Sequence, residues 1–231
     1  ISGIVASTNN LAPALATIAT VSNELLPPKE LLGKQIFYNA EDPRMNRDSY
    51  LSCASCHLEG GQDGQVWDFT NRGEGLRNTI GLMGRSGMGH GRVHWSANFD
   101  EIQDFEHDIR GAFGGDGFMS DGLFNAGTRN QPLGDPKAGL SAELDALACY
   151  VSSLTNVNPS PFRNADGSLT SDGLSGKTIF ASLNCASCHT GNQFTDSSAG
   201  VFHDVGTLKP GSGQRHGQPL TGIDTPTLKG I

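Results

Sequence analysis

Apolar residues recur at helical spacing in three segments of the chain, around residues 31–37, 141–154 and 174–180. The second segment starts at Ser141, whose side-chain oxygen can cap a helix. Its apolar positions are Leu144, Leu147, Ala148, Val151 and Leu154. Runs with the strand period of two are scarce, so the pattern predicts an all-α fold with long loops.

Two of these segments repeat one phrase. Gly-Lys-x-Ile-Phe stands at 33–37 and again at 176–180, and each copy precedes a cysteine motif. The repeat predicts two tandem domains of one kind. The expected boundaries are an extension or linker at 1–24, a first domain at 25–156, a linker at 157–173 and a second domain at 174–231.

Four of the five cysteines lie in two identical pentapeptides, Cys53–His57 and Cys185–His189, both reading Cys-Ala-Ser-Cys-His. This pattern attaches c-type haem: the two thiols bind the porphyrin and the histidine binds the iron. A zinc site is the alternative, but its cysteine pairs usually lie about 12–20 residues apart. We therefore predict two covalent haems. The residues that hold them are Cys53, Cys56, His57, Cys185, Cys188 and His189.

The composition agrees with a chain built around cofactors. Only 36% of the 231 residues are apolar and 31 are Gly, which leaves little aliphatic core for the length. A buried porphyrin supplies apolar area that the side chains lack. We expect each domain to fold around its haem.

Acidic residues outnumber basic ones by 24 to 16, giving a net charge of −8. A nucleic-acid partner is not expected, because such proteins carry basic surfaces. Membrane insertion is not expected either, since no apolar run approaches about 18–20 residues. Residues 1–22 lack a basic residue, as in a mature or cut N-terminus. Because c-type haem is attached outside the cytoplasm, we expect a periplasmic, secreted or cell-surface protein.

Several phrases resemble the bacterial di-haem cytochrome c peroxidase and MauG superfamily. Gly75–Thr79, reading Gly-Leu-Arg-Asn-Thr, follows the first haem motif. Phe-Thr-Asp at 194–196, Phe-His-x-x-Gly at 202–206 and Thr-Pro-x-Leu-Lys at 225–229 follow the second. The resemblance implies two class I cytochrome c-like domains with a division of labour. The first haem, on His57, would react with peroxide, and the second would pass it electrons.

The resemblance also implies roles for three residues between the motifs. Trp95 matches an aromatic residue between the haems, although a core tryptophan is the alternative. Gln103 matches a distal glutamine that positions peroxide. The family's distal glutamate has no clear match; of the nearby carboxylates we favour Glu106, and a solvated charge is the alternative.

The ligands on the far side of each haem stay open. No Lys, His or Met lies between Leu58 and Asn78, so the first haem lacks the usual ligand there. His90 and His94 could ligate it, line its pocket or bind a metal. For the second haem, the family's ligand follows the Thr-Pro phrase. We expect either that the chain is truncated before that ligand or that His203 or His216 serves.

The family also binds calcium between its domains. Asn78 matches the side-chain ligand, with Asp224, Thr225 and Pro226 as partners. Oxygen ligands of this kind suit Ca²⁺, although Asn78 could equally be a turn residue.

Two functions follow from the sequence. The first is an oxidoreductase that reduces hydrogen peroxide, or performs a MauG-like oxidation, with electrons from a small redox protein. The second is a non-catalytic di-haem electron-transfer module of a larger secreted protein. An open position on the first iron favours the first function, and the unmatched distal glutamate favours the second.

Overall fold

The computed structural model describes residues 21–70 and 74–230. Most of the predicted extension at 1–24 and the last residue of the predicted second domain lie outside the described residues. The α-helices are α1 (Pro28–Tyr38), α2 (Cys53–Cys56), α3 (Glu106–Arg110), α4 (Asp121–Phe124), α5 (Ala142–Ser153) and α6 (Ser171–Ser182). The 3-10 helices are η1 (Leu58–Gly60), η3 (Ile102–Phe105), η4 (Cys185–Ser187), η5 (Ser197–Ala199) and η6 (Pro210–Ser212).

Three short antiparallel hairpins or strand pairs accompany the helices. β1 (Val66–Phe69) pairs with β2 (Gly75–Asn78). The other pairs are β3 (Phe202–His203) with β6 (Ile223–Asp224), and β4 (Gln214–Arg215) with β5 (Gln218–Pro219).

The prediction of an all-α fold is therefore wrong. The structure is 31% helical and 11% strand, a mixed α and β arrangement. The strands are two to four residues long, and β1 is exposed at three of its four positions. An alternation of apolar and polar residues cannot show over so few positions, so the sequence pattern carried no strand signal.

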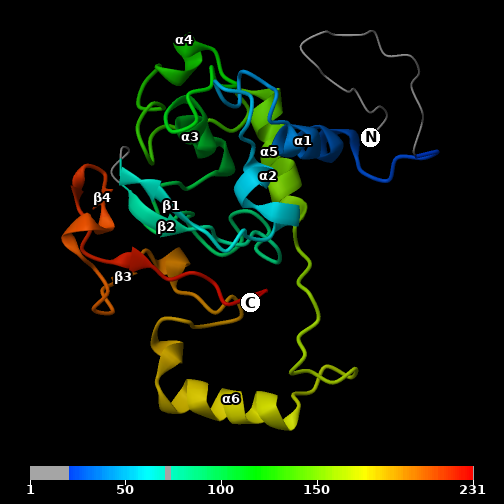
Figure 1. The fold of residues 1–231 in the computed structure, drawn as a ribbon, viewed down its shortest axis with the longest axis vertical. Helices are drawn as coiled ribbons and strands as arrows, with labels where there is room; N and C mark the ends of the chain where they lie inside the picture. Colours follow the sequence, from blue (N-terminus) through cyan, green and yellow to red (C-terminus); the bar gives the residue numbers. More distant parts are fainter. Residues whose placement is uncertain (1–20, 71–73, 231) are drawn as a thin grey trace.

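The main core lies where α1 crosses α5, next to α2 (Figure 1). The Ser141 hydroxyl accepts a bond from the Leu144 N–H at 3.3 Å, so α5 begins where its cap predicts. Gly33 lets the two helices approach closely, because a Cβ there would lie 1.8 Å from the Ala146 carbonyl oxygen. Phe37 and Tyr150 meet edge to face at 5.2 Å between ring centroids. The first predicted helix pair thus builds one wall of the interior.

The segment after α5 contributes much less to the core. Residues 154–170 connect α5 to α6 through an extended stretch and then a turn closed by the bridge between Arg163 and Leu169. Helix α6 lies at the far end of the molecule from α4 (Figure 1). No residue of α6 is buried, and Leu183 is 70% exposed. The division into two haem domains stays a prediction. No helix of the described residues is long and apolar enough to cross a membrane.

Candidate haem site

A cavity of about 1400 Å³, including its open mouth, lies between α2, the β1–β2 hairpin, residues 79–95 and α5. Cys53, Cys56 and His57 line one side of it. The apolar side chains around them are Phe37, Trp67, Phe69, Ile80, Leu82, Val93, Ile102, Phe105, Phe113, Leu147 and Val151. The first haem motif thus faces a large, mainly apolar cavity of the kind that binds flat organic cofactors.

The first motif is held in a single helical turn. The backbone N–H of Ser52 donates to the Ser55 hydroxyl at 3.0 Å, and that of His57 donates to the Cys53 carbonyl at 2.9 Å. Burial raises the pKa of the Cys53 thiol to about 12 and that of the Cys56 thiol to about 11. The apolar surroundings therefore disfavour the thiolate form of both side chains.

His57 fits the role of an iron ligand. Burial lowers its pKa to about 4, although the nearby backbone of Gly61 and of Ile80 acts in the opposite direction. Its Nδ1 atom is buried without a hydrogen-bond partner. The imidazole is therefore neutral near pH 7, and neutral imidazole is the form that binds metals.

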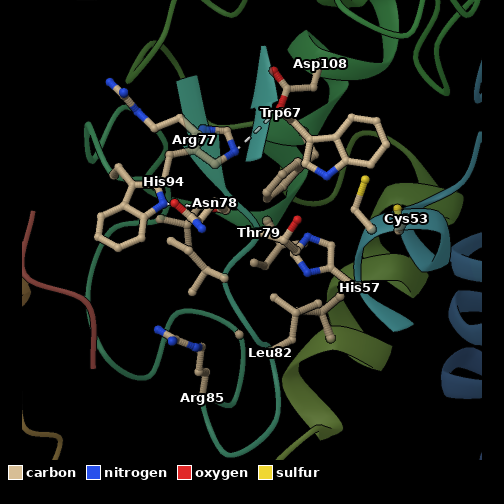
Figure 2. Close-up of a pocket in the computed structure, with 18 of the residues that line it drawn as sticks. Cys53, His57, Trp67, Arg77, Asn78, Thr79, Leu82, Arg85, His94 and Asp108 are labelled. Carbon is tan, nitrogen blue, oxygen red and sulfur yellow. Dashed lines mark hydrogen bonds and ion pairs between the residues drawn. The ribbon is translucent and has the colours of Figure 1, made fainter. Parts of the chain in front are cut away.

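A histidine–carboxylate pair lies in the same cavity. His94 Nε2 is 3.5 Å from Asp108 Oδ2, and His94 Nδ1 lies 2.7 Å from Asn98 Oδ1 (Figure 2). Phe99 and Phe105 pack on the ring, with centroids 4.5 Å and 5.0 Å away. These contacts fix the His94 ring, and both members of the pair line the cavity together with His57.

Gln103 and Glu106, predicted to act on peroxide, do not line this cavity. Gln103 donates through Nε2 to Asp145 Oδ1 on α5 at 2.8 Å. Glu106 is fully buried and accepts from Arg110 Nε at 2.7 Å and from the backbone N–H of Met119 at 3.0 Å. The structure thus engages both side chains in packing contacts and does not bring them to His57. Their catalytic role stays a prediction.

Trp95 does line the cavity, where it connects two distant segments. Its indole N–H donates to the Asn78 carbonyl at 3.0 Å, and its own carbonyl accepts from the Asp224 N–H at 2.8 Å. It therefore joins β2, which follows the first motif, to β6, which follows the second.

The residues predicted to bind calcium gather at this junction. Asn78, Asp224 and Pro226 line the cavity, and the buried Thr225 offers a carbonyl that accepts from the Thr195 hydroxyl. Burial raises the pKa of Asp224 to about 6, and the charge of Asp196 acts in the same direction. The Oδ1 atom of Asp224 is buried without a partner. The calcium site stays a prediction, and a buried carboxylate with one oxygen free of hydrogen bonds is chemically suited to it.

The second motif lies on η4, away from this cavity. His189 Nδ1 is hydrogen-bonded to the Phe194 carbonyl at 3.0 Å. Since a carbonyl only accepts, Nδ1 carries the proton and Nε2 keeps its lone pair for a metal. His189 thus fits an iron ligand held by a backbone contact.

His203 lies next to the second motif. Its Nε2 atom is 2.6 Å from Asp196 Oδ2, and both form a group with Cys188 whose ligand atoms lie within 4.8 Å of one another. His216, the other candidate ligand, lies at the β4–β5 turn, and burial lowers its pKa. The structure places His203, but not His216, in this group.

The sequence favoured Glu106 among the nearby carboxylates, whereas the structure brings Asp108 to the cavity. A signal for choosing it was present: Glu106 and Arg110 are four residues apart, a spacing that pairs them on one helix face. Asp108, two residues after Glu106, therefore lies on a different face of the helix. The sequence named His94 as a candidate to line the pocket of the first haem, and it does line the cavity, but no pattern paired it with Asp108.

The fold defines the class of protein to which the chain is related. The fold is shared with a MauG-like protein and with a hydrazine synthase structure, so the resemblance predicted from the sequence is confirmed at the level of the fold. No protein-family model matches the sequence.

The particular relatives are as follows. The chain is 33% identical over 185 residues to hydrazine synthase subunit gamma of Kuenenia stuttgartiensis, which covers 75% of this chain and 48% of that protein. It therefore spans about half the length of that relative. Its structure matches a hydrazine synthase structure from the same organism, with a TM-score of 0.58, 23% identity, and coverage of 95% of this chain and 83% of the other. It also matches a MauG-like protein associated with microbial copper homeostasis, with a TM-score of 0.58, 17% identity, and coverage of 91% and 69%. These likenesses support a haem-related redox role.

Proposed function

We propose that the chain is a di-haem c-type cytochrome that reduces hydrogen peroxide at the cavity beside the first motif. The observation that carries the proposal is the presence, in one cavity, of the Cys53–His57 attachment site and the His94–Asp108 pair. Haem bound at Cys53, Cys56 and His57 supplies an iron that exchanges electrons. The remaining chemistry belongs to the side chains of the cavity.

The pair His94–Asp108 is suited to moving protons. Reduction of peroxide breaks its O–O bond, takes up two electrons and two protons, and releases two waters. A carboxylate beside an imidazole favours the protonated ring, which can then donate to an oxygen. Asn98 and the flanking phenylalanines hold the ring in one orientation. Nδ1 of His94 is engaged with Asn98 and Nε2 faces Asp108, so the proton held between His94 Nε2 and Asp108 is the one that passes to a peroxide oxygen.

Electrons would come from the second haem, held by Cys185, Cys188 and His189, after delivery by a small redox protein. Trp95 supports this path, because it links the strand after the first motif to the strand near the Thr-Pro phrase. We also propose calcium at Asn78 and Asp224, and attachment of both haems in the periplasm or at the cell surface. A MauG-like oxidation would use the same residues with a different electron source.

One observation favours a second candidate function. The relative at 33% identity is one subunit of a synthase, and this chain spans about half of it. A chain of this kind can therefore be part of a larger redox protein. In that case it would be a di-haem electron-transfer module, and no peroxide would react at its cavity.

Haem-loaded protein with defined variants separates the two candidates. Absorbance of the alkaline pyridine complex counts the haems, and optical and EPR spectra are recorded before and after one equivalent of peroxide. We expect two haems and a peroxide-dependent spectral change.

His94→Gln and Asp108→Asn should lower peroxide turnover by about 10²- to 10⁴-fold at unchanged haem content. Asp166→Asn, which removes the same charge in an exposed linker turn, is the matched control.

The outcomes decide between the functions. Two haems whose spectra peroxide leaves unchanged, even after half-reduction, would contradict the peroxidase proposal and leave the electron-transfer module. Turnover that survives both cavity substitutions would contradict the assignment of His94 and Asp108.

A further inference from the structure

Arg85 is a buried cation inside the cavity. It lines the cavity wall and is only 7% exposed, and its Nε atom is buried without a hydrogen-bond partner. Burial lowers its pKa to about 10, and burial is the one cause of that shift. Within residues 21–70 and 74–230, no carboxylate forms an ion pair with it.

The carboxylates that share the cavity with Arg85 are engaged elsewhere. Glu74 accepts from the Ser96 hydroxyl at 2.8 Å and from Asn98 Nδ2 at 3.0 Å. Asp108 lies against His94. Asp224 is hydrogen-bonded to Ser197. Burial raises its pKa, and the cations that act in the opposite direction are Arg215 and Arg92, not Arg85. The protein itself therefore supplies no counter-charge.

Arg85 is also held in position. Its loop is fixed to the end of α5, because the N–H of Gly84 donates to the Leu154 carbonyl at 2.9 Å. Gly87 packs so closely on Ser152 that a Cβ there would lie 2.7 Å from the hydroxyl oxygen. Figure 2 shows Arg85 beside Leu82, at the opposite end of the cavity from Asp108.

His90 adds a second polar group at this end. It is 7% exposed and its Nδ1 is buried without a partner. Its pKa falls to about 4, first through burial and then through the charge of Arg85. The site therefore presents a cation and a neutral ring, which together suit a single anion and not a second cation.

An unpaired buried charge costs several kcal/mol, so a buried guanidinium is expected to have an anionic partner. We propose that Arg85, together with His90, binds a propionate of the haem attached at Cys53 and Cys56. The inference rests on the haem-binding function proposed above. Peroxide is neutral near pH 7 and would leave the guanidinium uncompensated. Arg85 is thus a positioning residue, which orients the cofactor and neutralises one of its carboxylates.

The test compares reduction potentials of the first haem in haem-loaded variants. In Arg85→Gln the propionate loses its counter-charge and stabilises the ferric state, so the potential should fall. A propionate released from a guanidinium also takes up a proton at a pH about 1–3 units higher, so the potential should become pH-dependent at higher pH than in the unmodified protein. Arg85→Lys should restore most of the potential. Arg163→Gln, which removes the same charge on the exposed linker, is the control.

The other charged groups lining the cavity are Glu74, Arg77, Arg92, His94, Asp108 and Asp224, together with the neutral His57 and His90. Among these groups, His90 also responds to Arg85→Gln, because the charge of Arg85 lowers its pKa. The pH profile is therefore compared in His90→Gln and in the double variant His90→Gln/Arg85→Gln as well, where the difference cannot come from His90.

Haem content is measured first, because it tests the haem-binding proposal separately from the assignment of Arg85 to a propionate. An unmodified protein without covalent haem would contradict the haem-binding proposal itself. Two haems with the same potential and pH profile in Arg85→Gln and Arg163→Gln would overturn the propionate assignment only. If Arg85→Gln does not retain haem, the frequency of the propionate bending band is measured by resonance Raman spectroscopy instead. It should shift between the unmodified protein and Arg85→Lys, and an unchanged band would overturn the inference.

Discussion

Glu106 and Asp108 lie two residues apart on α3 and meet different surroundings. Glu106 is enclosed by Arg110 and the backbone of residues 118–119, whereas Asp108 reaches the cavity and His94. Neighbouring positions on a helix face different directions, so a shift of two residues separates a packing role from a chemical one. For these two carboxylates, the direction in which the side chain points decides its contacts more than the residue type does.

Asp224 gives a residue-scale prediction about pH. Its pKa is raised to about 6 from 3.8, so the folded protein holds a proton that the unfolded chain has lost. Stability should therefore fall as pH rises from about 4 to 6, by up to about 3 kcal/mol, and stay low above that. Asp224→Asn should remove this loss and be more stable than the unmodified protein at pH 7.5. Urea denaturation of haem-loaded protein at several pH values measures it.

Added calcium tests the proposal that the carboxylate of Asp224 is a metal ligand. If Ca²⁺ binds at Asp224 and Asn78, millimolar calcium should stabilise the unmodified protein at pH 7.5, and much less so Asp224→Asn. Equal stabilisation of both proteins would contradict a calcium site at this residue. A pH profile that does not change on substitution would contradict the raised pKa.

At the scale of elements, the repeated phrase produces two helices with different surroundings. Gly33 in α1 lies against α5, while the equivalent Gly176 in α6 has nothing within 4 Å of its added Cβ. The same sequence thus serves close packing in one copy and an exposed helix in the other.

The two glycines form a matched pair for mutation. Gly33→Ala places a methyl group against the backbone of α5 and should destabilise the fold by about 1–3 kcal/mol or more. Gly176→Ala should be neutral or stabilising by about 0.5–1 kcal/mol, because alanine favours the helix. Thermal denaturation of both haem-loaded variants measures the difference. Equal destabilisation would show that the two helices have equivalent packing in the loaded protein.

At the scale of the whole molecule, the charge of −8 bears on how a redox partner would approach. Opposite charges steer diffusing proteins together, and salt screens that attraction over about 10 Å at 0.1 M. We predict that electron transfer from a basic small cytochrome slows as ionic strength rises. Stopped-flow reduction of the haem-loaded protein at about 20 to 500 mM salt, over which the Debye length falls from roughly 20 Å to about 4 Å, measures this.

The control for this prediction is an acidic donor of similar potential, whose reaction should become faster with salt. Rates that do not respond to ionic strength with either donor would contradict electrostatic steering, and would point to a donor held in a stable complex.

The sequence by itself determined the chemistry that is local in the chain. The two motifs predicted to attach haem, at 53–57 and 185–189, are contiguous, and each can be found without knowing the fold around it. Ser141 and the apolar spacing after it located α5, and the repeated phrase located α1 and α6. Caps and helical periodicity act within a few residues, so neighbouring residues suffice to predict them.

Tertiary structure decided what surrounds those motifs. Gln103 meets Asp145, His94 meets Asp108, and β3 pairs with β6, in each case through contacts between separate segments. Whether Arg85 has a counter-charge also depends on every segment that lines the cavity. Long-range packing sets these distances, and no local pattern encodes them. The motifs therefore predict the cofactor, and the fold selects which polar side chains line the cavity beside the first motif.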